Sequence, residues 1–410
     1  MMNMISVFKQ QVCEVLEQNI LRFWIDRMQD REHGGFYGRM DGKGVLCPKA
    51  EKGAVLNARL LWTFAASYRV LSQLAPQNAH LSEYKKAALR AKEYILQHFI
   101  DREHGGIYWS VDYLGQPLDM KKQSYAQGFM IYGMSELTRA TGDREALRCA
   151  IDLFCLLEEH AYDRLHMGYI EALTRDWLPI SDMRLSDKDE NGSRTMNTHL
   201  HILEPYTNLY RVWKDERLER QLRRLISIFT EKLINARTHH LDLFFDDEWQ
   251  GLRNIESYGH DIEAAWLLTE ALEVLGDDRL MQDTMPVVRQ IAMAAEEGLT
   301  ADGAMIHERK FDAEGALLYA DNERHWWVQC ENVIGQLNMY QHFHDEHALH
   351  KALQCWEYIR RNLIDYEHGE WYWSRSSDGT VNSDEDKAGF WKCPYHNSRM
   401  CLEVLESFSF

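Results

Sequence analysis

The residue types best suited to chemistry gather near the carboxyl end of the chain, in the segment FWKCPYHNSRM at residues 390–400. Pro394 suits the first position of a helix, where its fixed φ angle is useful and its missing N–H is not needed. His396 and Arg399 then lie one turn apart, which places an acid–base group beside a fixed cation. Trp391 adds a flat apolar surface. The segment also fits an aromatic-rich packed terminus, so its interpretation depends on the rest of the chain.

Other apolar segments begin with polar side chains of the same kinds. They carry, in chain order, Asn57 and Arg59, Tyr125 and Gln127, Asn197 with His201 and Glu204, His260 with Glu263, and Trp327 with Glu331. If these segments are parallel helices of one barrel, their first turns meet at one mouth, and these side chains belong to one cavity. His199 lies about 200° around its helix from Asn197 and is the less suitable site residue. Because Glu263 follows His260 by one turn, its carboxylate could hold the imidazole in one tautomer.

Several kinds of function fit such a cavity. His201, His260 and His396 could form a zinc site, although the chain has no His-Glu-x-x-His or Cys-x-x-Cys motif. A glycoside hydrolase needs two carboxylates on either side of the scissile bond. The candidates for that pair are Glu263 with Glu331 and Asp187 with Asp189. A sugar-binding scaffold without catalysis would keep the tryptophans but would not need three histidines.

Proton transfer beside a carbonyl group uses the residues that are present. A histidine with a pKa of about 6.5 can take the C2 proton of an open-chain aldose and later return it. Two histidines on different faces of the planar enediolate allow return to the opposite face, which inverts C2, and this chemistry needs no cofactor and no metal. The cation of Arg59 is suited to stabilise the oxyanion that develops at O1.

A turn motif repeats along the chain and divides it into units. The segment DREHGGFY at residues 30–37 returns as DREHGGIY at 101–108, and looser copies begin near residues 162, 239, 301 and 366. A motif that returns about every 65 residues identifies a repeat protein. Because two consecutive glycines supply the unusual φ angles that end a helix, we interpret the motif as punctuation between helices and not as a binding site.

Two kinds of helix fill the spaces between these turns. Segments that are apolar nearly all round predict buried inner helices at 52–70, 122–139, 194–213, 256–275, 326–343 and 391–408. Segments with one apolar stripe predict outer helices at about 5–27, 77–99, 144–161, 215–236, 278–297 and 346–364. This alternation predicts an all-α fold, an (α/α)6 barrel with short β-hairpin-like turns, in preference to an open superhelical solenoid. No Pro-, Ser- or Gly-rich linker interrupts it, so we expect residues 1–410 to form a single catalytic domain.

The composition limits the partners. With 46 basic and 64 acidic residues the net charge is −18, which disfavours nucleic acids and anionic membranes. The first residues show no basic segment followed by an apolar run, and no apolar run approaches about 18 residues, so we expect neither a secretory signal nor a membrane span. Eight cysteines without a Cys-x-x-Cys pair are typical of reduced thiols in a cytoplasmic protein. Because a closed barrel leaves no face that needs a partner, we expect a monomer.

Four blocks of the sequence resemble a known family. They are KGAVLNAR at 52–59, MNTHLH at 196–201, SYGHDIEA at 257–264 and WKCPYHN at 391–397, and the resemblance runs from about residue 5 to about residue 405. On these blocks the chain is similar to the cellobiose 2-epimerases of the N-acylglucosamine 2-epimerase superfamily. The resemblance implies an (α/α)6 barrel that converts the reducing-end glucose of β-1,4-linked disaccharides, such as cellobiose and lactose, into mannose without metal or nucleotide. The N-acylglucosamine epimerases and the mannose or glucose isomerases of the superfamily are the alternatives.

The resemblance also implies a role for each candidate residue. His260 and His396 would form the acid–base pair that moves the C2 proton, and His201 would assist ring opening and hold the open chain. The residues implied to bind the sugar are Arg59, Tyr125, Asn197, Glu263, Trp327, Glu331, Trp391 and Arg399. Ser398, where many relatives have glycine, and Gln329, where an acid is common, depart from the family pattern and bear on substrate range.

Overall fold

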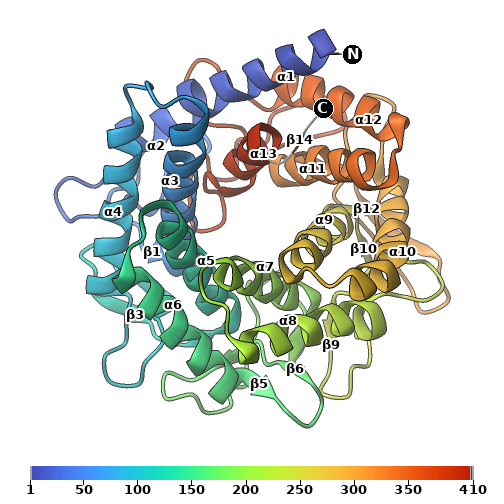
Figure 1. Ribbon diagram of the computed structural model, residues 1–410, viewed down its shortest axis with the longest axis horizontal. Coiled ribbons are helices and arrows are strands. Elements are labelled where there is room, and N and C mark those ends of the chain that lie inside the picture. Colours follow the sequence, from blue (N-terminus) through green and yellow to red (C-terminus); the bar gives the residue numbers. More distant parts are fainter. Residues whose placement is uncertain (1, 407, 409–410) are drawn as a thin grey trace.

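Long helices from successive repeats line the centre of the molecule in the computed structural model, which describes residues 2–406 and 408 (Figure 1). The inner helices are α3 (Ala54–Leu74), α5 (Ser124–Thr141), α7 (Met196–Val212), α9 (Tyr258–Leu275), α11 (Trp326–Phe343) and α13 (Tyr395–Glu406). Each contacts the next in chain order, and α13 contacts α3, so the ring is closed. The (α/α)6 barrel predicted from the sequence is confirmed.

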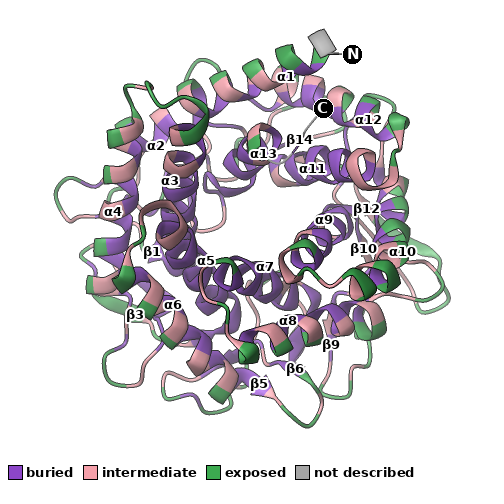
Figure 2. Ribbon diagram, in the orientation of Figure 1, coloured by how far each residue is buried: buried purple, intermediate pink, exposed green. Residues whose placement is uncertain are grey.

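A second layer of helices surrounds this ring. It consists of α1 (Met2–Glu14), η1 (Val15–Leu21) and α2 (Arg22–Arg27), followed by α4 (Leu81–His98), α6 (Arg144–Leu156) with η2 (Leu157–Ala161), α8 (Glu216–Ile228) with η3 (Phe229–Leu233), α10 (Asp278–Ala295) with η4 (Glu296–Gly298), and α12 (Glu346–Asn362). Figure 2 shows the inner helices buried all round and the outer helices exposed on one side, as the two apolar patterns predict. Four outer helices have an aspartate at the N-cap position, and these residues are Asp143, Asp215, Asp277 and Asp345.

Each copy of the repeated motif forms a tight antiparallel turn. The paired residues are Gln29 and Phe36, Ile100 and Ile107, Tyr162 and Tyr169, Ile234 and Leu241, Leu299 and Met305, and Ile364 and Trp371. In the first copy, Asp30 accepts two backbone N–H groups of the turn and the buried Lys52 Nζ at 2.7 Å. The second copy repeats this arrangement with Asp101 and Lys122 at 2.9 Å. In these two copies the motif connects the turn to the residues just before an inner helix, which supports its interpretation as punctuation.

Side chains of the inner helices also fasten these turns. Gln127 pairs with the backbone N–H and C=O of Ile107, both at 3.0 Å, and Gln329 pairs in the same way with Met305 at 2.8 Å. His199 plays the same part, because its Nε2 accepts the N–H of Tyr169. Gln127 and Gln329 are therefore structural residues, and His199 faces a turn, as its helical position predicts.

Short antiparallel strands connect the turns at the start of the inner helices. They are β1 (Lys52–Gly53), β2 (Ser110–Val111), β3 (Pro117–Asp119), β4 (Lys122–Gln123), β5 (Tyr162–Asp163), β6 (Gly168–Tyr169), β7 (Ala172–Leu173), β8 (Arg194–Thr195), β9 (Phe244–Phe245), β10 (Asn254–Ser257), β11 (Glu308–Phe311), β12 (Leu317–Asp321), β13 (Arg324–His325) and β14 (Ser374–Arg375). The sheets are β1-β2-β3 and β10-β11-β12, with the pairs β4-β7, β5-β6, β8-β9 and β13-β14. The sheet β10-β11-β12 is longer than the turns expected from the sequence.

The ends of the inner helices differ slightly from prediction. Residues 52–53, 122–123 and 194–195 are strands rather than first helical residues, because their backbone groups pair with neighbouring strands. Helix α13 begins at Tyr395, directly after Pro394, and not at residue 391. The sequence predicted that this helix ends at residue 408. Residue 407 lies outside the described residues, and so do residues 1, 409 and 410 of the predicted domain. Among the described helices, none combines the length and the apolar character needed to cross a membrane.

Candidate active site

The inner helices present the candidate residues at one end of the ring. Each lies within the first six residues of its helix: Arg59 on α3, Tyr125 on α5, Asn197 and His201 on α7, His260 and Glu263 on α9, Trp327 and Glu331 on α11, and His396 and Arg399 on α13. Trp391 joins them from the turn before α13, where its ring centroid lies 5.9 Å from that of Tyr125. The structure thus brings residues from all six repeats together.

A carboxylate holds His396 in one orientation. Nδ1 of His396 lies 2.7 Å from Oε1 of Glu331. The same carboxylate accepts Nη2 of Arg399 at 2.7 Å and Nε1–H of Trp266 at 2.9 Å. Because a carboxylate only accepts hydrogen bonds, the histidine proton belongs on Nδ1 and Nε2 is the basic nitrogen. No described residue bonds to Nε2, and the ring of Trp327 lies beside that of His396, with centroids 5.7 Å apart.

A serine holds His260. Its Nδ1 lies 2.8 Å from Oγ of Ser257, at the end of β10, and its ring centroid is 4.7 Å from that of Trp327. Trp327 therefore contacts both histidines of the expected acid–base pair. The expectation that Glu263 orients His260 is wrong, because Glu263 bonds to Arg399 instead. His260 instead bonds to Ser257, which lies three positions before it and precedes the helix.

His201 is oriented by Glu204, one turn further along α7. Nδ1 of His201 lies 3.1 Å from Oε2 of Glu204. Pro205 lacks the N–H that would bond the carbonyl of His201, and the backbone at His201 departs from helical angles, with φ −87° and ψ 17°. A side chain at Gly128 of α5 would come within 2.4 Å of that carbonyl oxygen, so α5 and α7 pack closely only because this residue is glycine.

The site histidines are neutral bases at neutral pH. Burial is the main cause, and it lowers the pKa of His201 and lowers that of His260 and His396 well below the ordinary value. The cations of Arg59 and Arg399 add to this effect at His396, and the neighbouring histidines add to it at His260. A neutral imidazole with a free Nε2 can accept a proton from carbon, whereas an imidazolium cannot.

Arg399 is the centre of a buried charge network that connects these groups. Its guanidinium donates to Glu204, Glu263, Glu331 and the hydroxyl of Tyr395. Burial would raise the pKa of Glu204, but the charge of Arg399 and the bond from His201 outweigh it and lower that pKa to about 2. Burial and the nearby Glu331 carboxylate raise the pKa of Glu263 well above its ordinary value. Burial raises the pKa of Glu331 as well, and the charge of Arg399 opposes the rise at both carboxyl groups.

The charge network gives two residues a role other than the one that the family resemblance implied. Arg399 and Glu331 are fully buried and bond to protein groups, which leaves them unsuited to the direct sugar contacts that the family resemblance implied. The candidate residues predicted from the sequence did not include Trp266 and Tyr395, which both bond within the network. Tyr395 lies next to His396 in the sequence, and this position could have identified it. Trp266 lies two turns into α9, where the apolar pattern predicts only a buried core residue.

Arg59 forms the opposite part of the site. Its guanidinium lies between the rings of Phe129 and Tyr395, at 4.3 and 4.6 Å from their centroids, and donates to the hydroxyl of Tyr125 at 2.9 Å. It also donates to the carbonyl of Trp391 at 3.5 Å. These contacts fix a cation beside the aromatic surfaces of the mouth.

A cavity of about 560 Å³ opens beside His260 and Asn197. Loop residues 183–192 and the β10-β11-β12 sheet line its other sides. Oδ1 of Asn197 is buried without a hydrogen-bond partner among the described residues, so a ligand hydroxyl would satisfy it. Trp327 and Trp391 are only partly buried, which leaves aromatic surface for a sugar ring.

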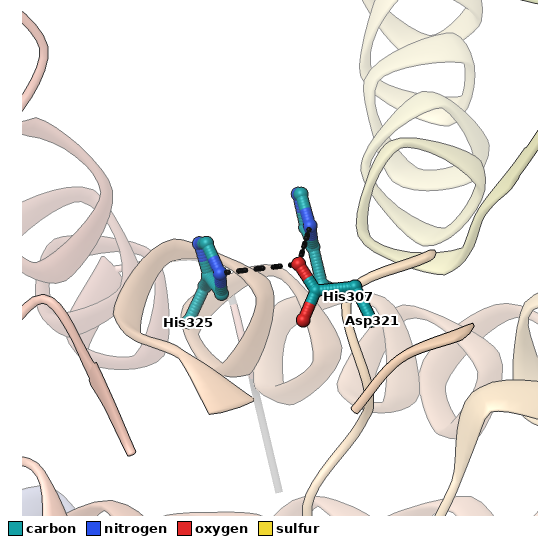
Figure 3. Close-up of side chains that lie close together, drawn as sticks. All are labelled: His307, Asp321 and His325. Atoms are coloured by element: carbon teal, nitrogen blue, oxygen red, sulfur yellow. Dashed lines mark hydrogen bonds and ion pairs between the residues drawn. The ribbon is translucent and has the colours of Figure 1, made fainter. Parts of the chain in front are cut away.

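Figure 3 shows a histidine pair on the wall of this cavity. Asp321, at the end of β12, lies 2.9 Å from Nδ1 of His307 and 3.8 Å from Nε2 of His325. The two rings stack with centroids 4.1 Å apart and planes 9° apart. Because the lone pairs of an imidazole lie in its ring plane, two stacked parallel rings do not point at one ion. The sequence analysis missed this cluster, because its members come from separate segments, the residue before β11, the end of β12 and strand β13, which only the folded chain brings together.

The geometry also bears on the alternatives. Glu263 and Glu331 bond to the same nitrogen of Arg399 and are almost fully buried, so no scissile bond fits between them as glycoside hydrolysis requires. That guanidinium also pairs with both carboxylates of the group formed by Glu263, Glu331 and His396. Among the described residues, no group with donor atoms close enough to share an ion combines His201, His260 and His396.

Comparison with known proteins adds to this picture. Residues 35–399 match the N-acylglucosamine 2-epimerase (GlcNAc 2-epimerase) family. A cellobiose 2-epimerase of Bacteroides fragilis is 56% identical over 400 residues, which covers 98% of this chain and 99% of the relative. The structure of cellobiose 2-epimerase from Bacillus thermoamylovorans matches with a TM-score of 0.90 at 38% identity, covering 98% of this chain and 100% of that one. An N-acylglucosamine 2-epimerase of Mus musculus is 23% identical, covering 98% of this chain and 92% of the relative.

Relatives of this similarity place the protein among the carbohydrate epimerases, which are isomerases. The chain belongs to the N-acylglucosamine 2-epimerase family. Within that family its sequence is far more similar to the Bacteroides fragilis cellobiose 2-epimerase than to the mouse N-acylglucosamine 2-epimerase.

Proposed function

We propose that the protein is a cellobiose 2-epimerase, which reversibly inverts C2 of the reducing-end glucose of β-1,4-linked disaccharides. Cellobiose becomes 4-O-β-D-glucosyl-D-mannose, and lactose becomes epilactose. The observation that carries the proposal is the pair His260 and His396, two neutral imidazoles from different helices, each fixed through Nδ1, with Trp327 in contact with both. Two bases on either side of a planar intermediate are what inversion at C2 requires.

The reaction begins with ring opening, in which His201 assists because its Nδ1 is held by Glu204 and its Nε2 is free of bonds to described residues. Nε2 of one histidine of the pair then takes the C2 proton and the electrons pass to O1, which gives an enediolate. Arg59 and Tyr125 lie together, and their N–H and O–H groups stabilise the negative oxygen. The other histidine takes up a proton from solvent water at Nε2 and delivers it to C2 from the opposite face. The first histidine releases its proton to water, so both imidazoles are neutral again when the ring closes on the mannose product.

Glu331, Glu204 and Arg399 act through the histidines as positioning residues. Glu331 keeps the proton of His396 on Nδ1, and Glu204 does the same for His201. Arg399 bonds to both carboxylates and so links the orientations of the two rings. Glu263 completes the group through its bond to Arg399, and its pKa is raised well above the ordinary value. Their effect on catalysis is therefore on the basicity of the histidines and not on sugar affinity.

Asn197, Trp327 and Trp391 bind the disaccharide. The two tryptophans supply stacking surfaces, and the unpaired oxygen of Asn197 accepts a sugar hydroxyl. The cavity beside Asn197 and His260 gives room for the second sugar unit. These features support a disaccharide substrate over a single N-acylated or free monosaccharide.

The remaining features of the proposal concern the whole chain. Residues 1–410 form one catalytic domain, supported by a ring in which the first and last inner helices are in contact. A closed ring supports a monomer, and eight free cysteines support a cytoplasmic location. We take a small disaccharide, and neither nucleic acid nor membrane, as the partner of this acidic protein.

Proton NMR of the enzyme with cellobiose in D2O tests the function. Formation of 4-O-glucosyl-mannose with deuterium at C2 is the expected result, and chelator-treated protein should give the same rate. Release of free glucose would instead show hydrolysis. If cellobiose and lactose stay unchanged while N-acetylglucosamine or mannose is converted, the alternative activities of the family replace the proposal.

A further inference from the structure

We propose that a second site, formed by His240, Glu256 and Glu297, binds a divalent metal ion of the zinc class. None of these residues lines the cavity described above. They come from three segments of the fourth repeat: the turn after η3, strand β10 and η4. The proposal does not depend on the proposed function, because it rests on a different cluster of side chains.

The imidazole of His240 is fixed in the way that metal-binding histidines are fixed. Its Nδ1 lies 2.7 Å from Oδ2 of Asp261, and the other oxygen of Asp261 accepts the backbone N–H of Leu241 at 2.9 Å. A carboxylate on one ring nitrogen sets the tautomer and directs the lone pair of the other nitrogen toward a ligand. His240 is 3% exposed, and its Nε2 is buried without a hydrogen-bond partner among the described residues. A buried polar atom without a partner calls for a ligand.

Two carboxylates face this nitrogen at the spacing of metal ligands. Oε2 of Glu256 and Oε2 of Glu297 each lie 3.7 Å from Nε2 of His240. This is longer than a hydrogen bond, but donors about 2.1 Å from a shared ion stand roughly 3.4 Å apart at a tetrahedral angle and roughly 3.0 Å apart at a right angle. The observed spacing is closer to the tetrahedral value. One imidazole and two carboxylates therefore favour a four-coordinate ion such as Zn²⁺ over octahedral Mg²⁺.

The surroundings allow such an ion to enter and remain. The side chain of Glu297 is 60% exposed, whereas those of Glu256 and His240 are 14% and 4% exposed, so the cluster is open to solvent on one side only. The hydroxyl of Tyr258 donates to Oε2 of Glu256 at 3.1 Å and holds that ligand in place. A water molecule on the side of Glu297 would complete the coordination.

A proton competes with the ion for Nε2. Burial lowers the pKa of His240, but Asp261, Glu256 and Glu297 outweigh it and raise the pKa above its ordinary value. Metal binding must release this proton, after which the ion takes the position between the same carboxylates. The His307, Asp321 and His325 cluster differs, because its stacked parallel rings do not share a direction toward one ion.

Titration of the EDTA-treated, desalted full-length protein tests the site. With Zn²⁺ in a calorimeter we expect one equivalent bound per chain, and with Co²⁺ we expect the visible d–d absorption of a four-coordinate ion. Glu297→Gln removes one ligand from an exposed position without disturbing the core, and we expect it to weaken Zn²⁺ binding at least about 10-fold. Zn²⁺ should also raise the melting temperature of the wild type more than that of this variant.

Asp321→Asn is the matched control, because it alters the other His–Asp cluster and leaves His240 untouched. It should bind Zn²⁺ as the wild type does. The proposal is overturned if the wild type binds no stoichiometric Zn²⁺ or if Glu297→Gln binds it unchanged. Loss of binding in Asp321→Asn would assign the ion to the stacked pair instead.

Discussion

Replacing Glu331 by glutamine tests whether the carboxylate works through His396 or binds the sugar. Its Oε1 accepts two N–H donors, from His396 and Arg399, and its Oε2 accepts a third from Trp266. Glutamine has the same shape but one acceptor and one donor end. In one orientation the glutamine oxygen takes the place of Oε1, and the NH2 group then faces the N–H of Trp266, so that two donors meet. With the amide reversed, the NH2 group opposes both other donors and forces His396 to carry its proton on Nε2, which removes the base.

The magnitude follows from these contacts. A buried donor without a partner costs about 1–3 kcal/mol, and this lowers the stability of Glu331→Gln in either orientation. The loss of a charged acceptor for His396 lowers kcat by about 10²–10³, which corresponds to about 3–4 kcal/mol of transition-state stabilisation. KM for cellobiose should change little, because Glu331 is fully buried.

Steady-state kinetics with cellobiose and a thermal unfolding curve measure both effects on the same protein. Glu263→Gln is the matched control, because the pKa of Glu263 is raised well above its ordinary value and glutamine imitates a protonated acid. Its stability should stay within about 1 kcal/mol of the wild type. An increase in KM of tenfold or more for Glu331→Gln, with kcat unchanged, would show that Glu331 binds the sugar and would refute the positioning role.

Further predictions concern the histidines and tryptophans. His260→Ala and His396→Ala should each lower turnover by at least about 10²-fold in the NMR assay, and near-full activity would remove that residue from the catalytic pair. His199→Ala, which loses bonds to two backbone groups, should cost about 3 kcal/mol in denaturant unfolding while the folded enzyme keeps its kcat; specific inactivation would mean that His199 belongs to the site. Because burial lowers the pKa of the site histidines, kcat/KM should stay level as the pH falls to about 6.5 and decline only below it, and an acid limb above that value would contradict the neutral buried bases. Because the pKa of these histidines is lower in the folded protein than in the unfolded chain, the unfolded chain takes up protons at a higher pH. The free energy of unfolding should therefore fall as the pH drops below about 6.5. Trp327→Ala and Trp391→Ala should raise KM for the disaccharide more than they lower the melting temperature, and equal effects on cellobiose and on a monosaccharide substrate would argue against stacking.

The fold was predictable because its signals are local. The DREHGG motif at residues 30 and 101 marks the turns, and the all-apolar and one-stripe patterns separate inner from outer helices within single segments. The boundaries that differ, such as Lys52 and Gly53, depend on pairing with β2, which lies nearly 60 residues away. Local patterns carry no information about such partners.

The gathering of the candidate residues at one end of the ring was predictable from the sequence, and the bonds between them were not. Helical spacing placed His201 with Glu204 and turned His199 away from the cavity, because both relations lie within one helix. The bond between His396 and Glu331 joins residues 65 positions apart, and Arg399 reaches Glu204 across 195. The packing of separate repeats decides such bonds, and this is why residues expected to bind sugar are instead buried in the charge network.

The contact that closes the ring also sets the order in which the site is completed. Helix α13 is the last inner helix along the chain, and it carries both His396 and Arg399. Until it docks, Glu204, Glu263 and Glu331 stand together without the cation that offsets their charge, and a buried cluster of that kind is strongly disfavoured. Docking of α13 therefore supplies the cation that these carboxylates need when they are buried. Because His396 lies on the same helix, closure of the ring and completion of the histidine pair are one event.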